Sequence, residues 1–209
     1  MNAVNTDKDV DVEEDLDFKV ENVVGTVTVE IQDKLDLVKL SREIIDVEYN
    51  PERFPGVIMR VENPKATFLI FSTGKMVITG LKKVQQVKEA AHKAVKKIKK
   101  AGINISNPQI EIVNIVASGD LKTTVDLNMA ALVMEYAMYE PEVFPGLIYR
   151  LQDPKAVFLI FSTGKIVCTG VKNVEAVRVA VKKLHSHIQE LDLSIKDEYG
   201  EEYSEFNFL

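Results

Sequence analysis

The stretch FPGLIYRLQDPKAVFLIFSTGKIVCTG, residues 144–170, repeats the stretch FPGVIMRVENPKATFLIFSTGKMVITG, residues 54–80. Extended to Lys172 and Lys82, the two segments are identical at 20 of 29 positions without a gap. The chain is therefore a duplication. Two copies are too few for a solenoid, which favours a pseudo-twofold pair that shares one sheet.

Two acidic segments flank the duplicated part. Residues 1–18 hold seven acidic residues and one lysine, and residues 196–209 hold five acidic residues and one lysine. The remaining 20 acidic and 24 basic residues give the body a net charge of +4, although the whole chain has -6. We therefore expect an acidic tail over 1–18, repeats over 19–106 and 107–195, and a second acidic tail over 196–209.

Composition excludes several classes of protein. With 209 residues, of which 46% are hydrophobic, the chain can bury a sizeable core. Its apolar runs are shorter than the roughly 20 residues of a membrane helix, and its N-terminus is acidic where a signal peptide would be basic. The single cysteine, Cys168, excludes an internal disulfide and is expected in the core. We therefore expect a cytoplasmic protein that does not contact a membrane.

Motifs for enzymatic chemistry are missing from the sequence. The STGK segments lack the GxxxxGK[ST] spacing of a phosphate loop, and GxSxG does not occur. His92, His185 and His187 lack the spacing of zinc ligands, and we expect them on the surface of long helices. We therefore expect neither an enzyme nor a metal or cofactor site.

The first elements of each half are a strand and a short helix. KVENVVGTVTVEI, residues 19–31, is rich in valine and threonine and predicts a strand. In residues 35–45, apolar residues recur at helical spacing behind the N-cap candidate Asp36, and NMAALVMEYAM, residues 128–138, is the counterpart. The apolar positions of the first copy are Leu37, Leu40, Ile44 and Ile45.

Three short strands and a long helix complete each half. VIMRVE, ATFLIFS and KMVITGL are joined by the turns NPK and STGK, which predicts an antiparallel meander. The helix that follows carries one apolar stripe, so we expect an α+β fold whose helices cover one face of the sheet. The stripe comprises Val84, Val87, Ala91, Val95 and Ile98 in the first copy and Val174, Val177, Val181, Leu184 and Ile188 in the second.

The second face of the sheet lacks a cover in this arrangement. Side chains alternate along a strand, so Phe68 and Ile70 face one side while Leu69 and Phe71 face the other. If the helices bury only the first pair, the second pair belongs to an apolar surface that needs a partner. The alternative is a sheet covered on both sides, as in a parallel α/β fold. The tight turns argue against the crossovers that such a fold requires.

Such a face suits the minor groove of A·T-rich DNA. It carries valine, leucine and phenylalanine together with asparagine and threonine, and basic residues lie nearby in the sequence. A·T pairs present only acceptors in the minor groove, whereas guanine adds an amino donor. Amide and hydroxyl groups can donate to those acceptors, and phenylalanine can wedge between base steps.

The sequence resembles a known family, the TATA-box-binding proteins, and in particular their archaeal members. The resemblance covers about residues 19–195 and is carried by NPERFPGVIMR with PKATFLIFSTGKMVITG and by EPEVFPGLIYR with PKAVFLIFSTGKIVCTG. It implies a saddle: one curved, ten-stranded antiparallel sheet with four helices on its convex side and DNA on its concave side. It also implies a general transcription initiation factor in an archaeal cell, acting on chromosomal DNA.

The resemblance also assigns roles to residues of both repeats. The inserting pairs are Phe54 with Phe71 and Phe144 with Phe161. The residues expected in the minor groove are Asn22, Val24, Leu69, Val77 and Thr79 in the first repeat and Asn114, Val116, Leu159, Val167 and Thr169 in the second. Those expected near phosphates are Arg60, Thr73 and Lys75, and Arg150, Thr163 and Lys165. Phe68 and Phe158 are expected in the core.

Partners follow from the same resemblance. Glu140 and Glu142 are expected to recruit transcription factor B and, indirectly, RNA polymerase, whereas Asn50 and Arg53 break the acidic pattern in the first repeat. The exposed apolar face also predicts that the free protein can form a homodimer. The eight lysines of residues 82–100 are either a solvated surface or a contact with upstream DNA or a regulator.

A function of another class remains open from the sequence. A pseudo-symmetric module could use the apolar face to bind a protein or a small ligand and never meet DNA. A comparison of A·T-rich with G·C-rich duplexes separates the two functions.

Overall fold

The computed structural model describes residues 18–195, so the two predicted acidic tails lie outside the described residues, apart from Phe18. The first half begins with the long strand β1 (Phe18–Glu30) and the short helix α1 (Leu37–Glu43). Four strands and the long helix α2 follow. Their bounds are β2 (Val47–Tyr49), β3 (Val57–Val61), β4 (Ala66–Ile70), β5 (Lys75–Leu81) and α2 (Gln86–Lys100).

The second half repeats this order with two additions. Strands β7 (Thr124–Val125) and β12 (Ser194–Ile195) have no counterpart among the first-half strands and pair with each other in a small separate sheet. The other elements are β6 (Ser106–Asp120), α3 (Leu127–Val133), β8 (Ala137–Met138), β9 (Leu147–Gln152), β10 (Lys155–Ile160), β11 (Lys165–Val171) and α4 (Val174–Glu190).

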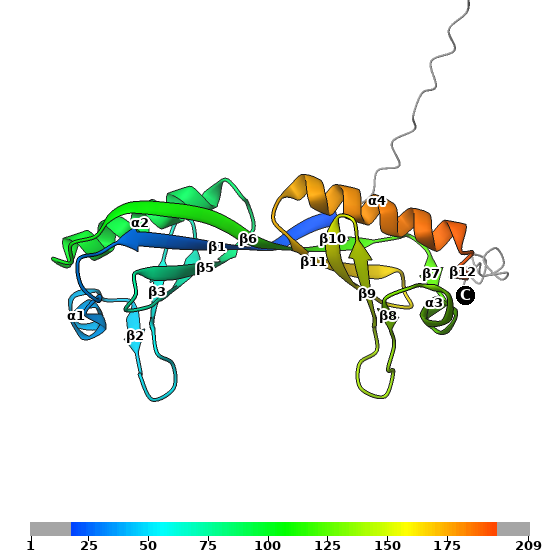
Figure 1. Ribbon diagram of the computed structural model, residues 1–209, viewed down its shortest axis with the longest axis horizontal. Coiled ribbons are helices and arrows are strands. Elements are labelled where there is room, and N and C mark those ends of the chain that lie inside the picture. The colour runs from blue at the N-terminus through cyan, green and yellow to red at the C-terminus, as the bar shows by residue number, and fades with distance from the viewer. Residues whose placement is uncertain (1–17, 196–209) are drawn as a thin grey trace, which may run out of the picture.

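One ten-stranded antiparallel sheet joins the halves, in the order β2-β3-β4-β5-β1-β6-β11-β10-β9-β8. Its central strands β1 and β6 pair with Val23 opposite Ile115. These two residues occupy equivalent positions in the aligned repeats, so the pseudo-twofold axis passes between them. Figure 1 shows the resulting arch, with α2 and α4 along its convex side, α1 and α3 at its two ends, and the β2–β3 and β8–β9 loops extending from the opposite side.

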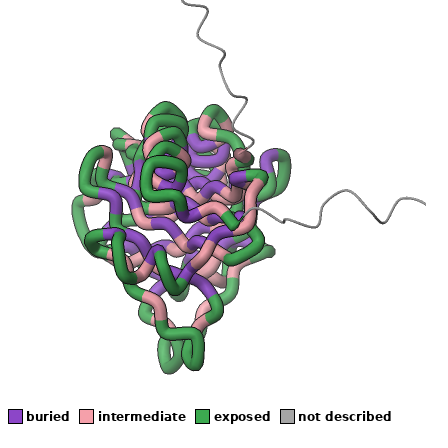
Figure 2. The backbone as a smooth tube through the Cα atoms, turned by 90° about the vertical axis from the view of Figure 1, so that its right-hand side faces the viewer, coloured by how far each residue is buried: buried purple, intermediate pink, exposed green. Residues whose placement is uncertain are grey.

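The helices bury one face of the sheet, which confirms the predicted fold class. Phe68, Ile70 and their counterparts Phe158 and Ile160 are fully buried. They pack with the apolar stripes of α2 and α4 in one continuous core. Figure 2 shows how buried and partly exposed residues alternate along the strands, as expected for a sheet with one covered face. Both Phe68 and Phe158 are core residues, as predicted.

Cys168 is also in the core, on β11. Only 1% of it is exposed, and burial raises the pKa of its thiol to about 12. The thiol is therefore a packing group and not a nucleophile at neutral pH. Among the described residues, none of the helices has the length and apolar character that crossing a membrane requires.

The short helices begin as predicted but end earlier. Asp36 caps α1 by accepting a hydrogen bond from the backbone N–H of Lys39, and Asp126 does the same for α3. The expected helical position of Ile45 is wrong, because α1 ends at Glu43 and Ile45 is 91% exposed. The chain must leave the helix there to enter β2, which pairs with β3 at the edge of the sheet.

The short helix of the second repeat also ends earlier than predicted. Residues 128–138 are helical only as far as Val133, and Ala137–Met138 form the edge strand β8. Val174 was predicted on the buried stripe of α4, but it is the first residue of that helix and is partly exposed. Ala176 is the first residue of the helix that packs against the core, and full burial begins at Val177.

Candidate nucleic-acid interface

Two asparagine–threonine pairs lie near the pseudo-twofold axis on the face opposite the helices. The Asn22 Nδ2 group donates to the Thr79 hydroxyl at 3.1 Å, and the Gly80 backbone N–H donates to Asn22 Oδ1 at 2.9 Å. In the second repeat, Asn114 Nδ2 donates to Thr169 at 3.0 Å. Its Oδ1 accepts from the N–H of Gly170 at 2.9 Å.

These contacts fix the direction of each amide. Since a backbone N–H can only donate, the atom facing Gly80 must be the amide oxygen, and the NH₂ group lies on the other side. One amide hydrogen serves the threonine and one stays available. Gly80 and Gly170 have φ of +90° and +86°, a conformation that glycine adopts without strain. The centre of this face therefore offers preorganised donors to an acceptor-rich ligand.

Apolar side chains form a row on each side of the donors. In the first repeat Leu69 lies opposite Val77, and in the second Leu159 lies opposite Val167. All four are partly exposed, while their strand neighbours on the helix side are buried. Val24 and Val116 continue this surface on the central strands β1 and β6. The face is apolar and uncovered within the described chain, as the alternation of residues predicts.

Sequence reasoning missed further members of these rows. Ile58 pairs with Leu69, and Ile148 pairs with Leu159, so each row extends onto the next strand. Thr26 pairs with Val77 and continues the first row onto β1. The sequence VIMRV could have identified Ile58. It is two residues from Arg60, so both side chains must lie on the same face of the strand.

A pair of phenylalanines stands at each end of the face. The rings of Phe54 and Phe71 are 5.6 Å apart at 61°, and those of Phe144 and Phe161 are 5.9 Å apart at 65°. These edge-to-face contacts are favourable for aromatic rings. One ring of each pair comes from the proline-rich loop and the other from the end of β4 or β10, so residues distant in sequence form one wedge at each end.

A glycine makes room for each wedge. A Cβ atom on Gly146 would lie 2.7 Å from the Phe144 ring and 3.2 Å from the Phe161 ring. A Cβ atom on Gly56 would lie 2.9 Å from the Phe54 ring and 2.7 Å from a backbone oxygen. The FPG motif therefore places each loop phenylalanine against its partner because the third residue lacks a side chain.

Each wedge lies beside a hollow that also holds predicted phosphate contacts. One hollow is lined by Phe71, Thr73, Lys75 and Val77 with Glu111 of β6. The other is lined by the matching second-repeat residues, with Lys19 of β1 in place of the glutamate. Those matching residues are Phe161, Thr163, Lys165 and Val167. The structure thus gathers these predicted site residues in two equivalent places.

The predicted arginines differ in their surroundings. Arg60 is exposed on β3, and its guanidinium donates to Glu48 at 2.6 Å. Arg150 is exposed at the equivalent position on β9, where Met138 replaces the glutamate. A phosphate would have to compete with Glu48 for Arg60, whereas it would meet no matching carboxylate at residue 138.

One carboxylate lies unexpectedly close to the pseudo-twofold axis. Glu21 accepts a hydrogen bond from the Ser118 hydroxyl at 2.9 Å and lies 3.5 Å from Lys19 and 3.6 Å from Lys82. The Ser118 hydrogen bond, with smaller contributions from the two lysines, lowers the pKa of this carboxyl below its usual value. The face therefore carries a negative charge that sequence reasoning did not place there, held by two cations.

Comparison with known proteins agrees with this geometry. The family described as "Transcription factor TFIID (or TATA-binding protein, TBP)" matches residues 17–101 and again residues 109–191. The chain belongs to this TATA-binding protein family.

Individual members of the TATA-binding protein family cover most of the chain. The TATA-box-binding protein of Pyrobaculum aerophilum is 47% identical over 190 residues, which are 90% of this chain and 94% of that protein. The TATA-box-binding protein of Aeropyrum pernix is 50% identical over 180 residues, 86% of this chain and 88% of that protein. The solved structure of Methanococcus jannaschii TBP has a TM-score of 0.74 and 43% identity and covers 83% of this chain and 98% of that chain.

Proposed function

We propose that this chain binds TATA-type DNA in the minor groove with its concave face and bends the duplex by inserting a phenylalanine pair at each end. The repeats, over 19–106 and 107–195, each grip one end of the element. The observation that carries this proposal is the placement of two equivalent aromatic wedges around a centre of preorganised amide donors. Membership of the TATA-binding protein family supports it.

The mechanism requires binding energy and no covalent chemistry. Partial unstacking of a base step costs a few kcal/mol, and the bend offsets this cost because it brings more DNA surface against the protein. The edge-to-face contact supports each ring, and the glycine behind it leaves the ring in position. The wedge is therefore formed before DNA arrives, which limits the ordering cost of binding.

Selectivity for A·T pairs follows from the centre of the face. The free amide hydrogens of Asn22 and Asn114 would donate to N3 and O2 acceptors, and a guanine amino group would project into the apolar rows. TA steps also deform more easily than other steps, which favours TATA-type sequences at the wedges. The backbone N–H groups of Gly80 and Gly170 hold the amides in this orientation. Thr79 and Thr169 each accept one amide hydrogen.

A competition experiment tests this function. The chain is titrated with a labelled TATA duplex, and A·T-rich or G·C-rich competitors are added at several salt concentrations. We expect the A·T-rich competitor to be stronger by about a hundredfold or more. If both competitors were equally strong, the apolar face would instead belong to a protein- or ligand-binding module. The salt slope reports how many phosphates the basic residues neutralise.

The cations around the face are proposed phosphate contacts. Lys75 and Lys165 are exposed beside the wedges, and Thr73 and Thr163 precede them in the same turns. Arg60 and Arg150 lie on the outer strands β3 and β9. When DNA is absent, the same apolar face could pair two copies of the chain. We expect the protein to act on chromosomal DNA in the cytoplasm of an archaeal cell.

The FPG glycine gives a prediction for one wedge. We expect Gly146→Ala to displace the Phe144 ring, because the new Cβ would lie 2.7 Å from it. The free energy of unfolding should fall by about 1–3 kcal/mol, and duplex bending should weaken at the same time. Val143→Ala in the same loop is the control, because Val143 is 80% exposed. Unchanged bending with Gly146→Ala would show that the ring position does not depend on this glycine.

Recruitment of transcription factor B is proposed for the loop between β8 and β9. Glu140 and Glu142 are exposed there. The backbone oxygen of Glu140 accepts hydrogen bonds from Val143 and Phe144, so a tight turn presents both side chains. RNA polymerase would follow through transcription factor B. Support for these partners comes from the family resemblance and from the exposed acidic loop.

Charge reversal in this loop tests the recruitment. We expect Glu140→Lys with Glu142→Lys to weaken the complex of DNA, this chain and transcription factor B by about tenfold or more, without loss of binary DNA binding. Glu52→Lys is the matched control, because Glu52 is the exposed counterpart of Glu142 in the first repeat. A ternary complex of normal affinity would contradict the assignment, and a gel-shift titration measures it.

A further inference from the structure

Exposed apolar side chains are concentrated in one half of this symmetric fold. Of the twelve large hydrophobic residues that are exposed in residues 18–195, ten lie in the second repeat. Among them, Val133 is 44% exposed, Tyr136 is 62% exposed and Leu191 is 42% exposed. Single exposed apolar residues are ordinary, but neighbouring ones that line the same hollow indicate an interaction site.

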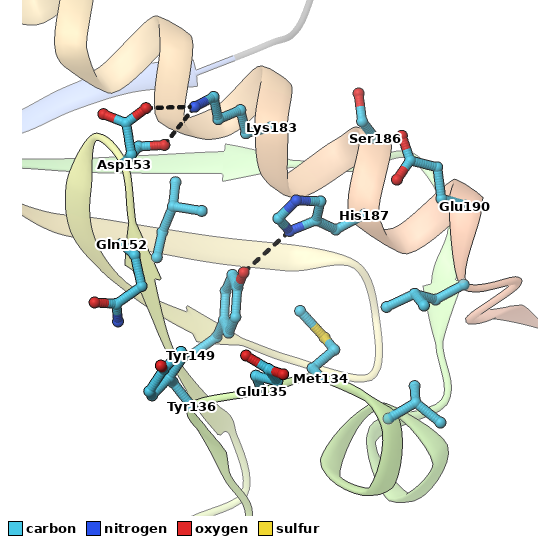
Figure 3. A pocket seen from close by; sticks show the side chains of 13 residues that line it. Met134, Glu135, Tyr136, Tyr149, Gln152, Asp153, Lys183, Ser186, His187 and Glu190 are labelled. Atoms are coloured by element: carbon cyan, nitrogen blue, oxygen red, sulfur yellow. Dashed lines mark hydrogen bonds and ion pairs between the residues drawn. The ribbon is translucent and has the colours of Figure 1, made fainter.

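These three residues border a hollow of about 540 Å³ on the outer side of the second repeat. Figure 3 shows the hollow between the C-terminal part of α4, strand β9 and the segment that follows α3. At its polar centre the Tyr149 hydroxyl lies 3.0 Å from His187 Nδ1. His187 is therefore partly buried and hydrogen-bonded, which corrects the expectation of a plain surface position.

The first repeat provides an internal comparison, because the residues of this region have counterparts ninety positions earlier. The counterparts of Val133 and Tyr136 are Glu43 and Asp46, both charged. Asp46 lies 3.8 Å from Lys97, which occupies the position of His187. The same region therefore carries an ion pair in the first repeat and apolar side chains beside a hollow in the second.

The charge that the long helix contributes to the region also differs between the repeats. Glu190, which lines the hollow, corresponds to Lys100 of the first repeat, and Ser186 corresponds to Lys96. Glu135 lines the hollow from the side of α3. Lys183, the basic residue of the lining, is already paired with Asp153 at 3.0 Å. The rim of the hollow thus presents two carboxylates around an apolar border.

We propose that this side patch, made of Val133, Tyr136 and Leu191 with Glu135 and Glu190, binds a basic amphipathic segment of a partner protein. Apolar side chains of the segment would cover the three hydrophobic residues, and a lysine or arginine would pair with the carboxylates. The hollow is large enough for such an anchoring side chain. The first repeat would bind the same segment less tightly, because Glu43 and Asp46 replace the apolar pair there and Lys96 and Lys100 add positive charge.

The polar floor of the hollow fits the same partner. Burial, and to a smaller extent the negative charge of Glu135, raises the pKa of the Tyr149 hydroxyl. The phenol therefore stays neutral and can accept from a lysine or arginine as well as bond to His187. Asp153 is turned toward Lys183 and does not compete for the incoming cation.

The side patch lies outside the concave face, so its occupant and DNA can be bound together. The residues of the patch come from the C-terminal ends of α3 and α4 and the residues that follow these helices, whereas the proposed DNA contacts come from the opposite face of the sheet. The bound segment would thus occupy only the second-repeat end of a nearly symmetric saddle. The inference does not depend on the proposed function.

A peptide titration tests the inference. The probe is a short fluorescent helix of leucine and lysine, and its leucine–glutamate counterpart is the second probe. We expect the lysine probe to bind about tenfold more tightly than the glutamate probe. Val133→Ser with Tyr136→Ser removes the apolar contacts at two exposed positions without adding charge and should weaken binding of the lysine probe by about tenfold. Glu190→Lys should weaken it by about threefold to tenfold.

The controls separate this patch from other surfaces. Val38→Ser makes the same change on α1, at a residue that is 44% exposed like Val133, and should leave binding unchanged. A saturating TATA duplex should also leave the lysine probe bound. Equal affinity for both probes, an equal loss with Val38→Ser, or displacement of the probe by the duplex would each overturn the inference. The last result would place the probe on the concave face.

Discussion

Replacing Phe144 and Phe161 together with alanine is expected to abolish bending at one end of a TATA duplex and to weaken binding by about a hundredfold. The reason is that each ring supports the other at 5.9 Å, so one wedge is lost as a unit. Without the wedge the base step stays stacked, and a straighter duplex contacts less of the arch. Fluorescence energy transfer across the duplex measures the bend, and anisotropy measures the affinity.

The first repeat supplies the matched comparison. Phe54→Ala with Phe71→Ala removes the equivalent wedge, whose rings are 5.6 Å apart, and should reduce the bend at the other end by a similar amount. The four-residue variant should bind DNA without bending it and still more weakly, and it should keep the part of the A·T preference that Asn22 and Asn114 provide. Full bending in either double variant would exclude insertion as the mechanism.

Two neighbouring residues of β4 are expected to give opposite results when each becomes alanine. Phe68 is fully buried against the helices, so Phe68→Ala should lower the free energy of unfolding by about 3–5 kcal/mol. Leu69 is partly exposed on the concave face, so Leu69→Ala should cost about 1 kcal/mol or less in stability but weaken DNA binding. Urea denaturation and anisotropy separate the two effects.

The second repeat repeats this experiment at Phe158 and Leu159. Phe158 is also fully buried, and Leu159 is partly exposed opposite Val167. A large loss of stability with Leu159→Ala, or a normal stability with Phe158→Ala, would mean that the two faces of the sheet are wrongly assigned. Because the residues are adjacent, differences in chain position or strand propensity do not explain a contrast between them.

The faces of the sheet were predictable because strand alternation is a strong local rule. The segment FLIF alone separates Phe68 from Leu69, and duplication gives a second, independent reading of the same pattern. The ends of the short helices were less predictable. Ile45 continues the apolar spacing of α1, but the chain turns away to pair β2 with β3, and this long-range pairing overrides the local pattern.

Other features depend on contacts that spacing does not reveal. Strands β7 and β12 are each two residues long and pair across almost seventy positions, so neither has a periodic signal. The hydrogen bond between Tyr149 and His187 joins a strand to a helix, and the spacing of these residues in the sequence does not predict it. The position of Glu21 against Ser118 follows from the register of β1 and β6, which three irregular steps in their pairing shift locally.

The pairing of Val23 with Ile115 has a consequence for half of the molecule. A fragment that ends after α2 would keep its own meander but lose β6, so β1 would have one edge without a partner. Since the two paired residues are equivalent, a second copy of the fragment could offer its own Val23 in place of Ile115. The fragment is therefore expected to assemble as a homodimer with an exact twofold axis, which is the arrangement from which gene fusion would produce the present chain.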